Sequence, residues 1–557
     1  MVERFFKVIH KEIDGLHEAA YLLGAFALFS KVLALLRDRL LAHNFGASEA
    51  LDIYYAAFRI PDFIYISIGS LVASAVLIPF IVPKLGRDGE ARDFFNGIFT
   101  LFSFATLAVS ILVFIFMPGL ADITTPGLSD AARSELVLLS RIMLLSPFFL
   151  GLSGLFASVT QSLRRFFVYA LGPVFYNIGI IIGVLFLYPY LGLPGLAYGV
   201  VLGSLLHAVV QLPVLFREGF SPRFSLAINL TEVKNVLLLS LPRTATLSAS
   251  HLVILIFVGV ASFMEEGSIS IFNFAFNLQS VPLSIIGISY SVAAFPTLSR
   301  LFSNGDKSAF ADQVLSSLRH IIFWSFPVVA LFIVLRAQIV RVILGTGEFG
   351  WPETKLTAAA LALFSVSVVA QSIILLLVRG YYAAGKTVIP LVVNITSSFF
   401  IVVCAGIALN VYNTSEIFQY FMESLFRISF VSGTAVIMLP LAFSAGMLLN
   451  AYVLWWLFRR EFSISRAALG ATFRQSLYAA VVIGFVSYEA LDIFDNVFDI
   501  NTFLGIFMQG LLSGALGIAA GVLLLRLLGS EEMKEASVSL HHKFWRTKPI
   551  APDQGEL

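Results

Sequence analysis

Charged residues and cysteines are scarce in this chain. Only 13% of its 557 residues are charged, whereas about 25% is usual in soluble proteins. The single cysteine, Cys404, lies in an apolar stretch, which excludes disulfides and cysteine-rich metal sites. The net charge of +2 gives no electrostatic support for nucleic-acid binding. We therefore expect neither a soluble protein nor a nucleic-acid partner.

Motifs for catalysis and metal binding are also missing. The eight histidines show no metal-ligand spacing, apart from the adjacent His541 and His542 near the end of the chain. We expect no phosphate-binding loop, and hence no nucleotide-driven pumping within this chain. The sequence thus predicts a protein that is not an enzyme and that holds no metal or cofactor.

Long apolar runs predict helices that cross a membrane. Hydrophobic residues make up 58% of the chain, and the mean hydropathy is +0.91. A helix needs about 20 apolar residues to cross a hydrocarbon core of roughly 30 Å. Runs such as 180–187 and 328–335 are continuous, whereas the strands of a transmembrane barrel alternate in polarity. The fold class that we predict is an all-α polytopic membrane protein.

About fourteen transmembrane helices of this length fit the sequence. We place them near 21–42, 52–82, 95–117, 136–160, 168–189, 193–216, 235–262, 270–302, 314–336, 355–383, 388–411, 432–458, 470–491 and 501–528. The second and eighth are unusually long, and each contains a proline, Pro61 and Pro282. We expect both to be bent, because proline leaves backbone groups that neighbouring helices or a cavity must satisfy.

Basic residues alternate between successive loops. Lys and Arg gather in every second loop, as at Lys84 and Arg87, and in both terminal segments. The remaining loops are mostly acidic, as at Glu265 and Glu266. Because basic loops stay on the cytoplasmic side of a membrane, this pattern predicts that both termini are cytoplasmic.

The chain carries an internal duplication. The clearest repeated pairs, at a nearly constant separation, are Gly46 with Gly267, Pro61 with Pro282, Pro173 with Pro390 and Asn177 with Asn394. An even number of spans separates the copies, so we predict two six-helix lobes related by a parallel repeat, plus two extra helices. In order, we expect an amphipathic cytoplasmic N-terminus at 1–20, an N-lobe at 21–216, a cytoplasmic linker at 217–234, a C-lobe at 235–458, spans thirteen and fourteen within 470–528 and a cytoplasmic tail at 529–557. This plan is typical of transporters; the alternative is a duplicated membrane scaffold that transports nothing.

Several charged residues fall inside the first two spans, where they are costly and usually face a cavity or a partner. Lys31 and Asp38 are two helical turns apart and share a face, as do Asp52 and Arg59. Cations at this depth suit an anionic group such as a phosphate or pyrophosphate. The alternative is local ion pairing, of Lys31 with Asp38 and of Arg59 with Asp52 or Asp62.

These positions define a candidate substrate site. Its substrate-binding residues are Lys31, Arg37 and Arg59, and its cavity-orienting or gating residues are Ser30, Asp38, Asp52 and Asn277. The eighth span is uncharged at the corresponding depth, so the two halves differ chemically.

Motifs in the first, second and tenth predicted spans carry a family resemblance. They are Phe29–Leu33, Arg37 with Asp38, Phe45–Ser48, Asp52, Ala57–Asp62, Gly347–Phe349 and Arg379–Thr387. Together they resemble the lipid II flippase family, MurJ (MviN), of the multidrug/oligosaccharidyl-lipid/polysaccharide (MOP) exporter superfamily. The similarity runs from about residue 21 to residue 530.

This resemblance implies a function. Such proteins have fourteen spans in two lobes and move undecaprenyl-pyrophosphate-linked peptidoglycan precursor from the cytoplasmic to the periplasmic leaflet by alternating access, for cell-wall synthesis. Lys31 and Arg37 match two of the family's cavity cations, which would hold the pyrophosphate. The implied partners are lipid II or a related polyprenyl-pyrophosphate glycan, membrane lipids and other cell-wall synthesis proteins. The implied location is the bacterial plasma (inner) membrane.

The chain also departs from the family pattern. The positions that depart are Tyr65 and Ile66 in place of an Arg pair, 69–71 in place of Glu-Gly-Ala, and Asn277 and Ser280 in place of an eighth-span Arg and Glu. The predicted seventh span, 235–262, lacks the carboxylate linked to sodium coupling. These departures leave two alternatives: a flippase for another polyprenyl-linked oligosaccharide, or a cation-coupled multidrug exporter. An extra segment, 416–427, is predicted to form an amphipathic helix on the outer surface.

Overall fold

The computed structural model describes residues 16–69, 72, 74–85, 87, 89–225, 229–465 and 469–537. Every regular element in these residues is helical, and the predicted all-α polytopic class is confirmed. Of the predicted N-terminal segment, residues 1–15 lie outside the described part, as do residues 538–557 of the predicted tail.

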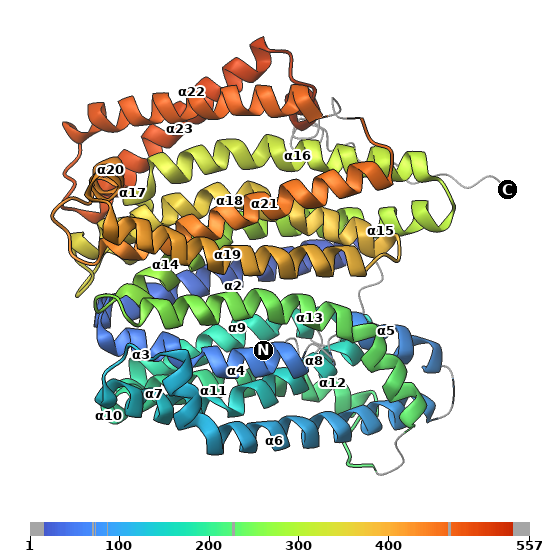
Figure 1. The fold of residues 1–557 in the computed structure, drawn as a ribbon. Helices are drawn as coiled ribbons and strands as arrows, with labels where there is room; N and C mark the ends of the chain where they lie inside the picture. The colour runs from blue at the N-terminus through green and yellow to red at the C-terminus, as the bar shows by residue number, and fades with distance from the viewer. Residues whose placement is uncertain are drawn as a thin grey trace, which may run out of the picture. The chain divides into compact units, whose positions relative to one another are not determined.

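The helices follow one another with short connections (Figure 1). The first half comprises α2 (Leu16–Phe45), α3 (Glu49–Ala57), α4 (Arg59–Ile64), η1 (Tyr65–Gly69), α5 (Ser74–Ile81), η3 (Val82–Lys84), α6 (Glu90–Thr124), α7 (Asp130–Met143), α8 (Leu145–Ser162), α9 (Phe166–Ile182), η4 (Gly183–Leu187), α10 (Tyr188–Leu191), α11 (Leu193–Val209) and α12 (Leu212–Arg217). The second half comprises α13 (Leu230–Ala261), α14 (Ser268–Leu283), η5 (Ser284–Ile288), α15 (Ser289–Ser303), α16 (Lys307–Val334), α17 (Arg336–Leu344), α18 (Trp351–Ala383), α19 (Val388–Thr414), α20 (Glu416–Phe426), η6 (Thr434–Ile437), α21 (Met438–Glu461), α22 (Gly470–Asp495) and α23 (Phe503–Leu527).

Twelve helical stretches of the described residues are long and apolar enough to cross a membrane, from Glu90–Thr124 to Phe503–Leu527. This makes the chain a multi-pass membrane protein. The first two predicted spans are not among the twelve. The first forms α2, whose second half carries several charged residues, and the second is divided among α3, α4, η1 and α5. The count of fourteen therefore stays a prediction.

The chain forms two compact units. Unit 1 comprises 1–278, 343–360 and 386–449, and unit 2 comprises 279–342, 361–385 and 450–557. The predicted lobe boundaries at 21–216 and 235–458 stay a prediction.

In unit 1, α9 packs against α2 and α11, and α11 packs against α8 (Figure 1). Glycines make the contact of α9 and η4 with α11 a close one. A methyl group placed on Gly183 would come within 2.7 Å of the Cα of Gly199, and one on Gly179 would meet Gly203. Small residues at such a seam let two membrane helices approach backbone to backbone.

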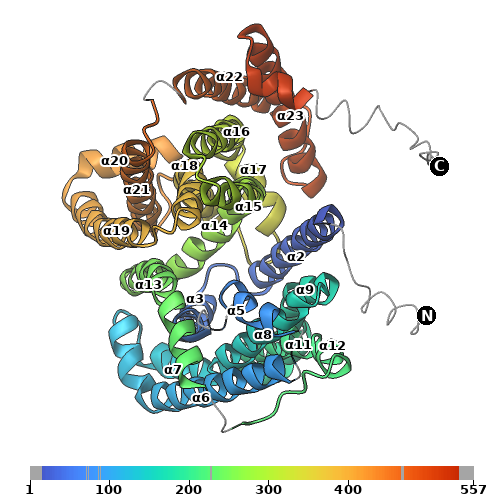
Figure 2. The ribbon, with the colours of Figure 1, turned by 90° about the vertical axis from the view of Figure 1, so that its right-hand side faces the viewer.

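In unit 2, α22 packs against both α16 and α23 (Figure 2). Small residues again line a helix contact: a methyl group on Gly517 of α23 would meet the side chain of Ser487 in α22. Predicted spans thirteen and fourteen are thus a packed helical hairpin.

The second and eighth predicted spans are each interrupted by a π-helical turn. Pro61 lies in α4 and is followed by η1, and Pro282 lies in α14 and is followed by η5. Proline removes a backbone donor, and π-helical turns are frequently found at functional sites. A local change of helix type thus occurs at corresponding places of the two halves, and the bends themselves stay a prediction.

One prediction from the sequence needs correction. The stretch Gly380–Thr387 does have the glycine and lysine spacing of a phosphate-binding loop, which was not expected in this chain. The structure places it where α18 ends at Ala383 and α19 begins at Val388, and Gly385 adopts a φ of 70°. A phosphate-binding loop requires a preceding strand. The match is therefore a helix-ending turn, and it gives no support for nucleotide-driven pumping.

Candidate functional site

A polar pocket of about 190 Å³ lies within unit 1 among α2, α3, α4, α9 and α14. We call it the arginine pocket. It is lined by Arg37, Leu41, Tyr54, Tyr55, Phe58, Arg59, Asp62, Tyr176, Asn273 and Asn277. Two of the three predicted substrate-binding cations, Arg37 and Arg59, therefore share one cavity, together with the predicted orienting residue Asn277.

Arg37 is held by its neighbour in the sequence. Its Nε and Nη2 donate to Oδ1 of Asp38 at 2.9 and 2.7 Å, and its Nη1 donates to Oδ1 of Asn177 at 3.3 Å. The other Asp38 oxygen, Oδ2, accepts a hydrogen bond of 3.1 Å from Nδ2 of Asn277. The Asp38 side chain is only 4% exposed, so α2, α9 and α14 jointly enclose this ion pair. That Asp38 orients the pocket stays a prediction.

Asn177 also fixes α9 to α2. Its Nδ2 donates to Oγ of Ser30 at 3.2 Å and to the carbonyl oxygen of Pro173 at 3.0 Å. Ser30 therefore positions Asn177, which in turn contacts Arg37, and Ser30 does not itself line the arginine pocket.

Arg59 has a neutral partner and a spare donor. Its Nη2 donates to Oδ1 of Asn273, whose Nδ2 in turn donates to the carbonyl oxygen of Ile269 at 2.7 Å. The Nε of Arg59 and the hydroxyl of Tyr55 are buried, and neither has a hydrogen-bond partner among the described residues. Because buried polar groups are nearly always paired, two free donors beside one cavity indicate a place for a polar ligand or water.

Asp52 binds the beginning of α14. Its Oδ2 accepts from the backbone N–H of Gly267 at 2.8 Å, and its Oδ1 accepts from the N–H and the hydroxyl of Ser270 at 2.7 and 2.6 Å. A carboxylate at a helix N-terminus satisfies free N–H groups and is favoured by the helix dipole. Asp52 therefore does not serve as the ion-pair partner of Arg59 and instead fastens α3 to α14.

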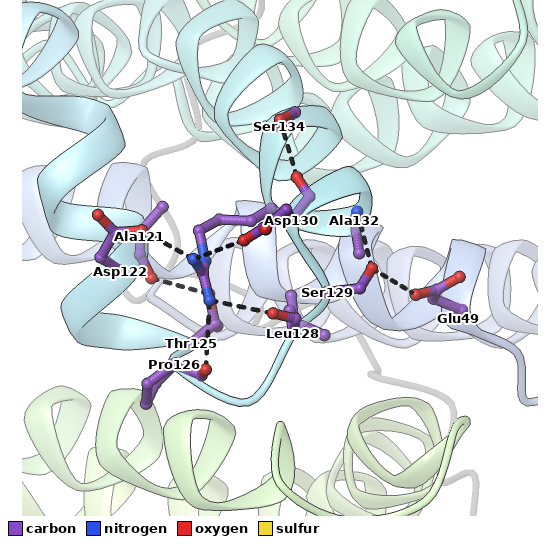
Figure 3. A network of polar contacts seen from close by, with 11 residues as sticks. Glu49, Ala121, Asp122, Thr125, Pro126, Leu128, Ser129, Asp130, Ala132 and Ser134 are labelled. Carbon is purple, nitrogen blue, oxygen red and sulfur yellow. Dashed lines mark hydrogen bonds and ion pairs between the residues drawn. The ribbon is translucent and has the colours of Figure 1, made fainter.

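Further polar contacts join helices of unit 1 outside the arginine pocket. Where α6 joins α7, Arg133 donates to the carbonyl oxygens of Pro126 and Leu128 at 3.2 and 3.0 Å, and Ser129 donates to Glu49 at 3.4 Å (Figure 3). In the loop that the charge pattern places on the cytoplasmic side, Nζ of Lys84 lies 2.7 Å from Oε1 of Glu232. Contacts thus join separate helices both at the beginning of α3 and at the beginning of α13.

Comparison with known proteins identifies the family. The family model of the lipid II flippase MurJ matches residues 41–509. This chain belongs to the MurJ family. It is 29% identical to the probable lipid II flippase MurJ of Thermotoga maritima over 452 residues, which cover 77% of this chain and 91% of the relative. It is 26% identical to the lipid II flippase MurJ of Burkholderia cenocepacia over 391 residues, covering 68% and 76% of the two chains.

Solved structures show the same fold. A lipid II flippase MurJ in an inward closed conformation superposes with a TM-score of 0.72 and 22% identity, covering 92% of this chain and all of that one. An inward-facing multidrug resistance MATE family transporter of the MOP superfamily gives a TM-score of 0.62 and 15% identity, covering 78% and 94%. The chain thus shares its fold with both a solved MurJ and a MATE transporter.

Within this MurJ-family fold, the predicted site residues separate into groups. Arg37, Arg59 and Asn277 line the arginine pocket, whereas Lys31 is not among its lining residues. Asp38 and Ser30 do not line the pocket: Asp38 binds Arg37 and Asn277, and Ser30 binds Asn177. Asp52 lies at the beginning of α14. That Lys31, Arg37 and Arg59 bind the substrate stays a prediction.

Sequence reasoning missed the tyrosines of the pocket. Tyr54, Tyr55 and Tyr176 come from two different helices and converge on Arg37 and Arg59. In a chain this rich in aromatic residues, tyrosines in apolar helices do not stand out. The one available signal was their position, because Tyr54 and Tyr55 lie between Asp52 and Arg59 and Tyr176 directly precedes the repeated Asn177.

Proposed function

We propose that this protein flips lipid II, the undecaprenyl-pyrophosphate-linked peptidoglycan precursor, from the cytoplasmic to the periplasmic leaflet for cell-wall synthesis. The observation that carries the proposal is the arginine pocket in a MurJ-family fold, where Arg59 and Tyr55 each keep a buried donor free. A pyrophosphate offers acceptor oxygens that a planar guanidinium binds in pairs. The protein is accordingly a transporter and not an enzyme.

The two arginines have different parts in this proposal. Arg37 is already neutralised by Asp38, so it offers the pocket a fixed and partly shielded cation. Arg59 is hydrogen-bonded to a neutral amide, which a phosphate oxygen can replace, and the carboxylate of Asp62 lines the same pocket. Arg59 therefore makes the primary pyrophosphate contact, Arg37 supports it, and Lys31 attracts the anion from outside the pocket.

Alternating access requires contacts that break in turn. The three hydrogen bonds that Gly267 and Ser270 donate to Asp52 at the beginning of α14 hold the side that the charge pattern predicts to be outside. The Lys84–Glu232 ion pair holds the cytoplasmic side. We propose that release of the headgroup needs the first set to open and that entry needs the second to open.

The location and partners complete the proposal. Basic residues in the terminal segments favour a cytoplasmic location for both termini, and the MurJ relatives favour the bacterial inner membrane. The lipid-linked precursor and the surrounding membrane lipids are the partners, and association with other cell-wall synthesis proteins is part of the same proposal.

A second candidate keeps the mechanism and changes the cargo. Asn277 and Ser280 stand where the family resemblance leads one to expect an arginine and a glutamate, and Asn277 binds Asp38. These uncharged residues favour a flippase for a different polyprenyl-linked oligosaccharide. A cation-coupled multidrug exporter is the third candidate, and it is supported only by the fold shared with MATE transporters.

One reconstitution experiment separates these candidates. The purified chain is placed in proteoliposomes, and the protection of labelled lipid II, of other polyprenyl-pyrophosphate glycans and of cationic dyes is followed over time. We expect lipid II to move fastest and the dyes not to move. Faster movement of another glycan would select the second candidate, and movement of the dyes alone would contradict the proposal.

A further inference from the structure

Helix α20 (Glu416–Phe426) lies in the connection between two membrane-crossing helices, α19 and α21. The hydroxyl of Ser415 caps its beginning by accepting from the N–H of Phe418, and Arg427, with a φ of 56°, ends it. A helix is thus present where the sequence predicted an amphipathic one. Nothing in the arginine pocket explains why it is there.

The exposed face of α20 is apolar. Ile417 is 84% exposed, Tyr420 72%, Phe421 56% and Leu425 55%. At 3.6 residues per turn these four positions fall on the same half of the helix. Just beyond the helix end, Phe430 is also fully exposed. A face of this kind on a soluble surface would be unusual, because contiguous exposed apolar patches mark contact sites.

Two polar side chains of α20, those of Gln419 and Glu423, lie on the opposite side, where Glu423 contacts the protein. Oε1 of Glu423 accepts hydrogen bonds from Nε2 of Gln419 at 2.9 Å, from the hydroxyl of Tyr412 at 3.0 Å and from the hydroxyl of Thr434 at 3.0 Å. Tyr412 lies in α19 and Thr434 begins η6, and both are buried. This network, which we call the Glu423 network, fixes the rotational orientation of α20 about its own axis. The apolar face is therefore held outward by specific bonds.

The axis of α20 lies across that of α19. In Figure 1 α19 is seen along its length and α20 end-on, and in Figure 2 the two helices exchange these views. Because α19 crosses the membrane, a helix running across its end follows the membrane surface. The exposed apolar side chains of α19 also extend toward this end, through Val403, Ile407 and Val411. The exposed apolar stripe of α19 thus reaches the end of the span at which α20 follows.

We propose that α20 is an interfacial helix whose apolar face inserts into the outer leaflet of the bilayer. Its in-plane axis, its aromatic side chains and its continuity with the exposed side of α19 all fit the boundary between headgroups and acyl chains. A protein partner would explain the apolar face but gives no reason for the continuity with α19. The helix then fixes the depth of this end of the protein in the leaflet that receives the flipped lipid.

The single cysteine of the chain makes a direct test possible. In a Cys404→Ser background, a spin label is attached to Phe421→Cys or Ile417→Cys on the apolar face, and to Ala131→Cys as a matched control. Ala131 is exposed in the first turn of α7, next to Asp130, whose side chain is fully exposed. The full chain is reconstituted into nanodiscs of phosphatidylglycerol and phosphatidylethanolamine. Collision of each label with oxygen and with a water-soluble nickel chelate is then measured.

We expect the ratio of oxygen to nickel collision at positions 417 and 421 to exceed that at position 131 several-fold, because oxygen concentrates in lipid. Equal ratios at all three positions would overturn the proposal, since the face would then be in water. Labels at 417 and 421 that are open to nickel in nanodiscs but shielded in native membranes would overturn it in favour of a protein partner. Circular dichroism of each variant checks that the helices are retained, and agreement between the two labelled positions guards against a local effect of either substitution.

Discussion

The second predicted span and the beginning of the eighth occupy corresponding places in the duplicated sequence, yet one is charged and the other neutral. The first carries Asp52 and Arg59, and the second carries Asn273 and Asn277. In unit 1 these two regions bind each other, because Asn273 accepts from Arg59 and the beginning of α14 donates to Asp52. The neutral repeat therefore supplies hydrogen-bond partners for the charged residues of the other repeat.

Removing the positive charge of Arg59 should have the largest effect on lipid II flipping. We expect Arg59→Ala to lower the rate of lipid II flipping by about 10–100-fold, since a hydrogen bond to a charged group is worth about 1.5–3 kcal/mol. The rate is measured by protection of labelled lipid II in proteoliposomes. Arg87→Ala, at an exposed arginine, is the matched control and should flip at the wild-type rate. An unchanged rate for Arg59→Ala would remove this residue from the substrate site.

Weakening the hydrogen bonds between Asp52 and the beginning of α14 should have the second-largest effect. Asp52→Asn exchanges charge-assisted hydrogen bonds at the beginning of α14 for neutral ones, and one amide nitrogen then faces an N–H group. We expect a loss of about 1.5–3 kcal/mol in the free energy of unfolding, visible as a lower melting temperature of the purified protein. Asp312→Asn changes an exposed carboxylate of α16 and should leave the melting temperature unchanged. Equal stability of the two variants would show that α14 does not depend on Asp52.

A substitution of Asn277, in the uncharged beginning of the eighth span, should have a smaller effect on flipping. Asn277→Ala removes one donor from Asp38, which still keeps both hydrogen bonds from Arg37. We expect flipping to slow by about fivefold, the equivalent of about 1 kcal/mol. Asn304→Ala, in an exposed turn, serves as the control. A loss as large as that of Arg59→Ala would mean that Asn277 touches the substrate directly.

The smallest effect is expected at a carboxylate held by neutral donors outside the membrane spans. Burial opposes ionisation of Glu423, but hydrogen bonds from Gln419, Tyr412 and Thr434 outweigh it and lower its pKa below the ordinary value of 4.5. A depressed pKa stabilises the folded state above pH 4.5, and this contribution disappears as the pH falls through the folded value. We expect less than about 1 kcal/mol, because the group is partly exposed.

The measurement is the melting temperature of wild type and Glu423→Gln between neutral pH and pH 3. The difference between the two proteins should be greatest near neutral pH and vanish at the acidic end. A difference that stays constant across this range would show that ionisation of Glu423 does not stabilise α20.

The sequence predicts the helical class and the two pocket arginines, because charges within apolar runs are rare enough to notice. It does not predict their partners. Arg37 and Asp38 are adjacent, so helical periodicity places them on different sides, but the long arginine side chain reaches back to the carboxylate. Asp52 and Arg59 share a helical face, which suggested that they form an ion pair. Asp52 instead accepts hydrogen bonds from the backbone N–H groups at the beginning of α14.

The remaining features depend on which helices become neighbours. The bond of Asn177 to Arg37 joins α9 to α2, and that of Asn277 to Asp38 joins α14 to α2. Side-chain spacing within one helix contains no information about such pairs. The inward side of α20 was equally hidden, because the sequence shows an amphipathic helix but not that its carboxylate is bonded to Tyr412.

The glycine seam between α9 and α11 has a mechanical consequence. Gly179 lies only two residues beyond Asn177, and Gly203 packs against the backbone of Tyr176. With no side chains between the two backbones, these helices have little freedom to slide or tilt against each other. The part of α9 that carries Tyr176 and Asn177 is therefore held in a fixed position against α11. Any widening of the pocket must come from its other walls, α2, α3, α4 and α14.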